Sequence, residues 1–212
     1  MTFGLPDPLP ILQSPPGYEY WKRMCKSKVI DYWENKLRAE ADLLPSLEFF
    51  KPSFMSLAKH HIILTFAHSP FEVGKAIVAI KMLSGRYPTD KLSRHWNNQN
   101  PEGLCQLPGC HSALGDLPHM LTTCPALADA RSKMLSLWNS FLVPRPNLFP
   151  VIREYSIVQQ NLFVQFLIDP SCLPLVLSQS RFDGTILGDC LYLSRTCCYA
   201  MHLARSRLMK EQ

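Results

Sequence analysis

Residues 105–124 read CQLPGCHSALGDLPHMLTTC, and this stretch decides how the fold of the chain is interpreted. It places two close pairs of metal-binding side chains, Cys105 with Cys110 and His119 with Cys124, on either side of an eight-residue loop. Proteins build tetrahedral zinc sites in this way, because each pair chelates the ion and the loop brings the pairs together. Three thiolates and one imidazole leave no open coordination position, so the motif predicts a structural zinc site.

Residues between the ligands favour a loop folded around a metal. Pro108 and Gly109 suit a tight turn within the first pair, and Asp116 can cap the helical turn that carries the second pair. Two alternatives stay open on spacing alone. The cysteines could form an unmetallated cluster, or His111, which directly follows the second ligand, could compete as a ligand.

The composition of the 212 residues sets the class of protein. Hydrophobic residues make up 47%, which is enough to bury the core of one or two domains. The net charge of +5 is a mild basic bias that is compatible with a polyanionic partner. We see no secretory signal and no membrane span, so we expect no membrane partner and an intracellular location, in the nucleus or cytoplasm. The cysteines outside the motif are then expected to be buried small hydrophobes.

The remaining sequence indicates a mainly α fold, namely an irregular helical domain with a small Cys-Cys-His-Cys loop. Residues 1–17 hold five prolines and predict an extended arm. Residues 18–143 are expected to form a helical region that contains the motif, beginning with a helix over 18–44. Residues 151–212 are expected to form a C-terminal helical region packed on it.

One helix has unusually complete start and stop signals. Ser69 can cap it, Pro70 fits its first position, Glu72 completes a capping box and Gly85 ends it. The expected apolar stripe of this helix consists of Val73, Ile77, Ile80 and either Met82 or Leu83.

Three further helices are expected on similar grounds. Thr89 can cap a short helix over 90–96, and Pro125 can start another. The expected apolar side of this second helix consists of Leu127, Met134, Leu137, Trp138 and Phe141. The last helix is expected over 186–209 and ends in a basic turn.

A group of cations precedes the cysteine motif. Arg86, Lys91, Arg94 and His95 surround the turn at residue 85, and Arg205 lies on the last helix. Positive charge beside aromatic side chains is typical of single-strand binding surfaces, so we take these five residues as candidate nucleic-acid contacts. The alternative is a solvated helix face and, on the last helix, a response to the helix dipole.

Further short motifs flank the cysteines. They are MLSGRY (82–87), Lys91-Leu92, RHW (94–96), GLC (103–105), Cys110, GDLPH (115–119), Leu121, Cys124-Pro125, QFLID (165–169), Leu173-Pro174, RTCCY (195–199), His202 and Arg205. Over roughly residues 44–210 the chain thereby resembles the region that follows the polymerase in non-LTR retrotransposon reverse transcriptases. Its four-residue first gap is wider than the tighter pairs common in such motifs.

The resemblance implies a function. It implies that Cys105, Cys110, His119 and Cys124 bind zinc and that the region handles RNA or single-stranded DNA beside a reverse transcriptase domain in a parent polyprotein. The paired aspartates that a polymerase needs for its two metal ions are missing, and no acid, base and nucleophile converge, so we expect no enzyme. A structural or protein-interaction module and an inactive retroelement remnant are the alternatives.

Overall fold

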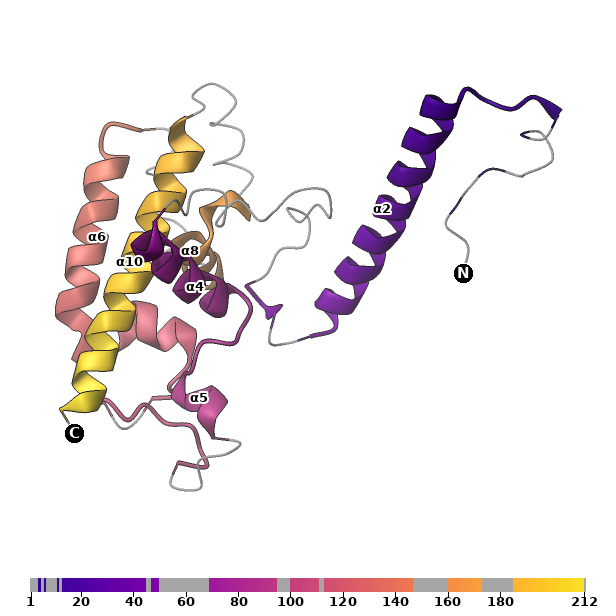
Figure 1. The fold of residues 1–212 in the computed structure, drawn as a ribbon. Helices are drawn as coiled ribbons and strands as arrows, with labels where there is room; N and C mark the ends of the chain where they lie inside the picture. Colours follow the sequence, from indigo (N-terminus) through magenta and orange to yellow (C-terminus); the bar gives the residue numbers. More distant parts are fainter. Residues whose placement is uncertain are drawn as a thin grey trace.

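The computed structural model describes residues 13–44, 47–49, 69–94, 100–110, 113–146, 160–172 and 185–211, together with Gly4, Pro6 and Ile11. Its helices are α2 (Tyr18–Asp42), α4 (Pro70–Leu83), α5 (Asp90–Ser93), α6 (Ala128–Leu142), α8 (Gln160–Ile168) and α10 (Thr185–Lys210), with the short turns η3 (His119–Thr123), η4 (Pro125–Leu127) and η5 (Pro170–Cys172) (Figure 1). The predicted mainly α class is confirmed. Over the described ranges, extended segments pair only at one antiparallel bridge, between Leu104 and Leu114. None of the helices described is long and apolar enough to cross a membrane.

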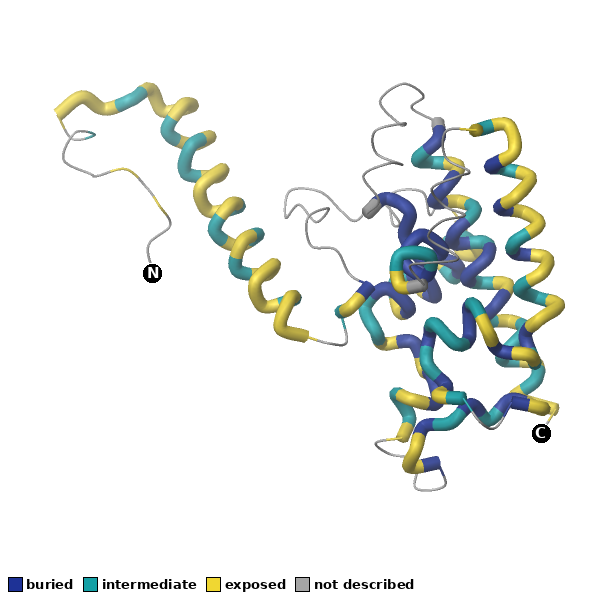
Figure 2. Tube along the Cα trace, turned by 180° about the vertical axis from the view of Figure 1, so that it is seen from behind, coloured by how far each residue is buried: buried dark blue, intermediate teal, exposed yellow. Residues whose placement is uncertain are grey.

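The last helix, α10, is the centre of the packed body. It lies against α4, α6, α8 and η5, and α6 runs antiparallel beside it (Figure 1). An ion pair of 3.7 Å joins Arg145, just beyond the end of α6, to Asp189, the fifth residue of α10. The burial colours of Figure 2 follow this arrangement, since the buried segments meet between the helices and the exposed residues face outward.

Most of the signals predicted for α4 are confirmed. The Ser69 hydroxyl accepts a hydrogen bond from the Glu72 backbone N–H at 3.2 Å, and Pro70 occupies the first turn. Gly85 follows the end of the helix with φ of +64°, the left-handed conformation that glycine adopts without strain. The Glu72 carboxylate accepts a hydrogen bond of 2.7 Å from the buried Lys75 ammonium rather than from the Ser69 backbone N–H, so only the Ser69 half of the predicted capping box forms.

The apolar face expected for α4 was wrong in part, because Met82 and Leu83 are buried and Ile80 packs against the core, but Val73 and Ile77 do not. The buried residues of this helix are Lys75, Ala76, Val78, Ala79, Met82 and Leu83. Val73 and Ile77, which were expected in the core, remain 43% and 47% exposed. Ala76 and Ala79 are completely buried, and their small side chains allow the α4 backbone to lie close to its neighbours. The choice of face therefore follows from packing distance rather than from the size of the apolar side chains.

A buried hydroxyl links α10 to the end of α8. The Ser194 hydroxyl on α10 lies 2.8 Å from the Leu167 carbonyl and 2.6 Å from the Ile168 carbonyl, which are among the last carbonyls of α8. These carbonyls lack partners within their own helix, so Ser194 satisfies the end of α8 from outside. Cys190, Cys197 and Cys198 are buried, as predicted for cysteines outside the motif, whereas Cys25 on α2 is only partly buried, contrary to that prediction.

α2 stands apart from the other helices (Figure 1). None of its residues is buried, and its helical span confirms the prediction for residues 18–44 to within two residues. The proline-rich arm of residues 1–17 lies mostly outside the described residues. The predicted division of the chain at 143–151 stays a prediction.

Candidate metal centre

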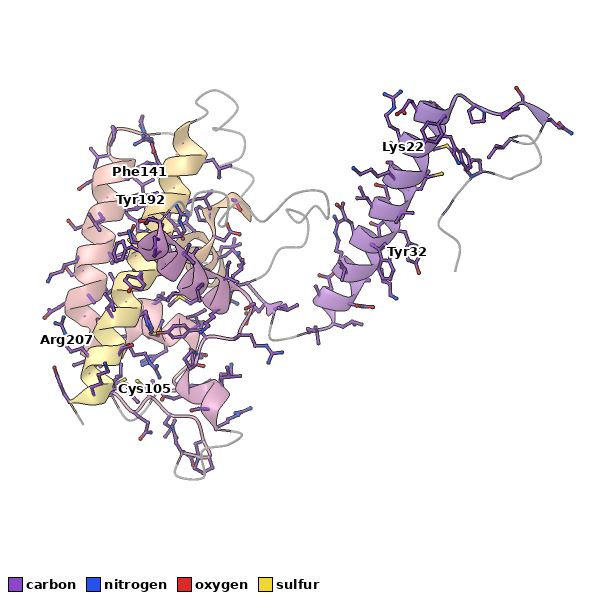
Figure 3. All side chains as sticks on the ribbon, viewed as in Figure 1. Lys22, Tyr32, Cys105, Phe141, Tyr192 and Arg207 are labelled. Carbon is purple, nitrogen blue, oxygen red and sulfur yellow. The ribbon has the colours of Figure 1, made fainter. Side chains whose placement is uncertain are left out.

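The four predicted ligands converge on one point. Cys105 and Cys110 flank a turn, while His119 begins the π-helical turn η3 and Cys124 directly follows it. Their ligand atoms all lie within 4.8 Å of one another. The three cysteines are buried and His119 is half-buried. Figure 3 places Cys105 at the end of the body where Arg207 lies, away from Phe141 and Tyr192.

The distances fit a tetrahedral ion. Zinc with sulfur ligands at about 2.3 Å and a nitrogen ligand at about 2.0–2.1 Å places two sulfurs about 3.8 Å apart and a sulfur and a nitrogen about 3.6 Å apart. The sulfurs of Cys105 and Cys124 are 3.9 Å apart. The Cys110 sulfur lies 3.1 Å from His119 Nε2, so a bound zinc ion would increase the distance between these two atoms by about 0.5 Å. A cavity of about 10 Å³, about the size of one water-sized sphere, lies among Cys105, His119 and Cys124.

A tight turn holds the first pair together. The Cys110 backbone N–H donates to the Leu107 carbonyl at 3.0 Å, with Pro108 and Gly109 as the central residues. Gly109 has φ of +72°, which explains why glycine follows proline here. This turn accommodates the wide four-residue gap between the first two ligands.

A π-helical turn holds the second pair. His119 and Cys124 are five residues apart, which would place them about 140° apart around an α-helix. Instead, the Cys124 backbone N–H donates to the His119 carbonyl at 2.8 Å, and this wider i→i+5 turn brings both side chains to the same side. The predicted cap is confirmed, since Asp116 Oδ1 accepts from the His119 backbone N–H at 2.9 Å.

Contacts behind the ligands orient them. His119 Nδ1 lies 3.0 Å from the Thr123 hydroxyl oxygen, on the side of the ring opposite to the cluster. If this nitrogen carries the proton and donates it to Thr123, Nε2 presents a lone pair to the ion. Arg131 Nη1 donates to the Cys124 carbonyl at 2.8 Å and fixes the end of the turn.

Burial disfavours the charged forms of three of the four predicted ligands, Cys105, Cys110 and His119. Burial raises the pKa of Cys105 to about 12, and the neighbouring thiols contribute to this shift. Burial also raises the pKa of Cys110 and lowers the pKa of His119. The protein alone therefore disfavours thiolates here, and a bound cation would supply the positive charge that stabilises them.

The metal loop is braced against α5. The Gly115 N–H donates to the Gly103 carbonyl at 2.8 Å, and the Gly115 carbonyl accepts from the Lys91 N–H at 3.0 Å. Asp90, the first residue of α5, is buried beside this contact and lies 3.3 Å from Arg205 Nη2 of α10. The loop, α5 and α10 thus share one polar junction next to the ligand cluster.

The predicted cations have different environments. Arg86, Lys91 and Arg94 are exposed, and Lys91 lies 3.7 Å from the Asp116 carboxylate. His95 lies outside the described residues, as does the alternative ligand His111. Arg205 differs from the three exposed cations, because its guanidinium lies 3.3 Å from the Asp90 carboxylate and only 13% of its side chain is exposed; its contact with nucleic acid stays a prediction.

A hollow of about 350 Å³ opens beside the exposed cations. Its apolar lining includes Phe49, Met82, Tyr87, Leu92 and Leu117, and its charged lining is Glu48, Lys91, Arg94 and Asp116. The sequence reading missed this hollow, since it joins segments that are far apart in the chain. The local sequence indicates only one feature of its lining, the cap of α5, in which the Thr89 hydroxyl accepts a hydrogen bond from the Leu92 N–H at 3.2 Å.

Comparison of the chain with models of protein families, with curated proteins and with solved structures finds no match. The similarity to retrotransposon reverse transcriptases therefore rests on the sequence motifs alone.

Proposed function

We propose that this chain is a zinc-stabilised module that binds single-stranded RNA or DNA and carries no polymerase activity of its own. The observation that carries the proposal is the junction between the ligand cluster and the exposed cations. The Gly115 carbonyl of the metal loop accepts the backbone N–H of Lys91, so an ion in the cluster would stiffen the segment that carries Lys91 and Arg94.

The chemistry of the ligands favours zinc. Three thiolates and one imidazole suit a borderline-soft ion in tetrahedral geometry, and they are poor ligands for magnesium or calcium, which prefer oxygen. With four protein ligands the ion has no position for a substrate. Its contribution would be to folding, as in other structural zinc sites.

The hollow and the cations together suit a single strand. Lys91 and Arg94, which line the hollow, and Arg86, which follows Gly85 of its lining, can neutralise phosphates, while the apolar lining can receive an unstacked base. The two carboxylates in the hollow, from Glu48 and Asp116, would repel a phosphate placed inside it, which leaves the base as the fitting occupant. Such binding would depend on salt and be tolerant of sequence.

The resemblance of the motifs supports an origin in the tail of a retroelement polyprotein, where a reverse transcriptase domain would precede this region. A structural or protein-interaction role is the second candidate, and the exposed helix α2 favours it.

Zinc content tests the metal half of the proposal. Elemental analysis of protein purified without chelator should give about one zinc per chain, and the variants Cys105→Ser and Cys124→Ser should lose it. Cys25→Ser is the matched control, because Cys25 lies on α2 and not in the ligand cluster. This variant should keep the zinc content of the wild type. Equal zinc in all four proteins, or none in any, would reject the site.

Fluorescence anisotropy with a labelled oligo-U RNA and a labelled oligo-dT DNA tests the nucleic-acid half. If three phosphates are neutralised, affinity should fall roughly 20-fold between about 50 and 200 mM salt, because the slope for single strands is about −0.7 per contact. The triple variant R86A/K91A/R94A should bind more weakly and with a shallower slope. Lys133→Ala, an exposed lysine on α6, serves as the control. If the zinc-loaded wild type does not bind at low salt, the nucleic-acid role is wrong while the zinc site stands.

A further inference from the structure

The hollow beside α5 contains one carboxylate that α8 holds in place. Glu48 and Phe49 are neighbours in its lining. The Asn161 amide donates to Glu48 Oε1 at 3.1 Å, and the Gln165 amide donates to the Phe49 carbonyl at 2.6 Å. Asn161 and Gln165 are one turn apart on α8, so this helix fixes the segment at two points. The Glu48 carboxylate therefore faces the hollow from a fixed position.

The two carboxylates of the hollow differ in the acceptor capacity that they have left. Asp116 Oδ1 accepts from the His119 backbone N–H at 2.9 Å, and Asp116 Oδ2 lies 3.7 Å from Lys91 Nζ. Both oxygens of Asp116 thus already face donors of the protein. Among the residues that the structure describes, Asn161 is the one hydrogen-bond donor to Glu48, and it bonds only Oε1. A carboxylate has about four acceptor positions, so Glu48 can accept further N–H groups.

The walls of the hollow belong to the hydrophobic core. Phe49, Met82, Tyr87 and Leu117 line it, and all four are buried in the core cluster. Side chains held by close packing do not rearrange freely, so the hollow is formed before a ligand arrives. Its volume of about 350 Å³ is near the lower limit of small-molecule sites, which measure about 300–1,000 Å³. It therefore suits one planar base.

Cations line the same hollow, since Lys91 and Arg94 border it together with Glu48. The site thus offers acceptors on a carboxylate and donors on two cationic side chains. A base that fits must present donors to the first and acceptors to the second.

Guanine matches this combination best among the bases. Its N1–H and N2–H groups are adjacent donors that one carboxylate can accept together, and its O6 and N7 atoms are adjacent acceptors for lysine or arginine. Adenine and cytosine offer a carboxylate one amino group beside a ring nitrogen that only accepts. Thymine and uracil offer one N–H between two carbonyl oxygens, which a carboxylate repels.

We propose that the hollow selects guanine at one position of the bound strand. Glu48 accepts the N1–H and N2–H groups of the base, while Lys91 or Arg94 donates to O6. The inference rests on the proposed binding of single strands. Only one base enters the hollow, so the remainder of the strand is still bound without regard to sequence. Glu48 is exposed, so the preference lies at the lower end of what a bidentate base contact gives, at about five- to tenfold.

Strands that carry a single base measure this preference directly. Labelled DNA strands of about seven nucleotides, abasic except at the centre, offer the hollow only one base. Guanine, hypoxanthine or thymine at the centre leaves the charge of the strand unchanged. In fluorescence anisotropy, zinc-loaded wild type should bind the guanine strand about five- to tenfold more tightly than the thymine strand. Hypoxanthine lacks the N2 amino group, so its strand should bind about threefold more weakly than the guanine strand.

Glu48→Gln separates base recognition from charge. The variant loses a negative charge, so it should bind the thymine strand at least as tightly as wild type does. Its preference for guanine over either other base should fall below about twofold, because an amide cannot accept two adjacent N–H groups as a carboxylate does. Glu102→Gln, an exposed carboxylate outside the hollow, is the matched control and should keep the preference of wild type.

The possible failures are distinguishable. Equal affinity of wild type for all three strands, or a preference that Glu48→Gln retains, overturns the selection of guanine and leaves single-strand binding in place. If neither these strands nor oligo-U RNA bind, the proposed function is wrong as well. Free guanosine monophosphate is another source of the same base. If it displaces the guanine strand at concentrations near the dissociation constant of that strand, the hollow binds a nucleotide, and selection within a strand is rejected.

Discussion

Replacing Gly115 by alanine should break the junction between the metal loop and α5. A Cβ at this position would lie 2.6 Å from Asp90 Cβ and 2.7 Å from Asp90 Oδ2, which are separations that packed atoms do not tolerate. Asp90 cannot yield freely, because it is the first residue of α5 and its other carboxylate oxygen lies 3.3 Å from Arg205 Nη2. Relief of the clash therefore requires separation of Asp90 from Arg205.

The size of the effect follows from the burial of that ion pair. Only 13% of the Arg205 side chain and 9% of the Asp90 side chain are exposed. Depriving a buried charge of its partner costs about 3–5 kcal/mol, so the free energy of unfolding of Gly115→Ala should fall by that amount. For a chain of this size the melting temperature should fall by about 6–20 °C.

Gly74→Ala is the matched control. Gly74 lies within α4, and a Cβ there would meet no atom within 4 Å. The substitution should raise the free energy of unfolding by about 0.5–1 kcal/mol, because alanine favours the helix. Both variants are compared with wild type by urea and thermal unfolding in the zinc-loaded state. A loss below about 1 kcal/mol for Gly115→Ala would show that α5 moves aside at little cost, and the reasoning would fail.

Three further outcomes are expected. Ser194→Ala should lower the free energy of unfolding by about 1–3 kcal/mol in urea titrations, because the Ile168 carbonyl loses the hydroxyl group that donates to it inside the body. No loss would mean that water replaces the hydroxyl. Burial, followed by the positive charge of the nearby Arg205, lowers the pKa of His202 below 6.5, so below that pH the unfolded state binds more protons than the folded state. The free energy of unfolding should therefore fall as the pH drops from about 7 through 6.5, and it should fall less in the variant His202→Asn. Zinc affinity, measured by competition with a chromophoric chelator, should fall by up to about a thousandfold per unit of decreasing pH, because the ion must displace the protons of three thiols. Burial, which raises the pKa of Cys105 to about 12, keeps that thiol protonated until the ion binds. An affinity that does not change with pH would contradict thiolate ligation.

The parts of the fold that depend on neighbouring residues were predictable. The caps at Ser69, Thr89 and Asp116 each involve a side chain and a backbone N–H three residues away. Such contacts can be predicted because both partners lie close together in the sequence. The two residues of each ligand pair in the metal cluster are also close in the sequence. This is why the helix starts and the four ligands agree with the structure.

Contacts between distant residues decided what was not predictable. Asp90 and Arg205 are 115 residues apart, and nothing near either one signals the other. The same holds for the buried Lys75, whose ammonium lies 4.5 Å from the ring centre of Phe71 nearby but also 5.1 Å from that of Tyr192. The spacing of the large apolar residues of α4 predicted that they face the core. In the structure Ala76 and Ala79 are fully buried instead, because α10 packs closely against α4.

The central position of α10 has a consequence for the order of folding. α4, α6 and α8 all precede α10 in the chain, yet each packs on it, and the contact between Tyr87 and His202 spans 115 residues. During synthesis the earlier helices would leave the ribosome before the helix that buries them. Until residues 185–210 are made, their apolar faces would stay exposed to aggregation or to chaperones, and the high sequence separation of these contacts predicts slow folding for a helical protein.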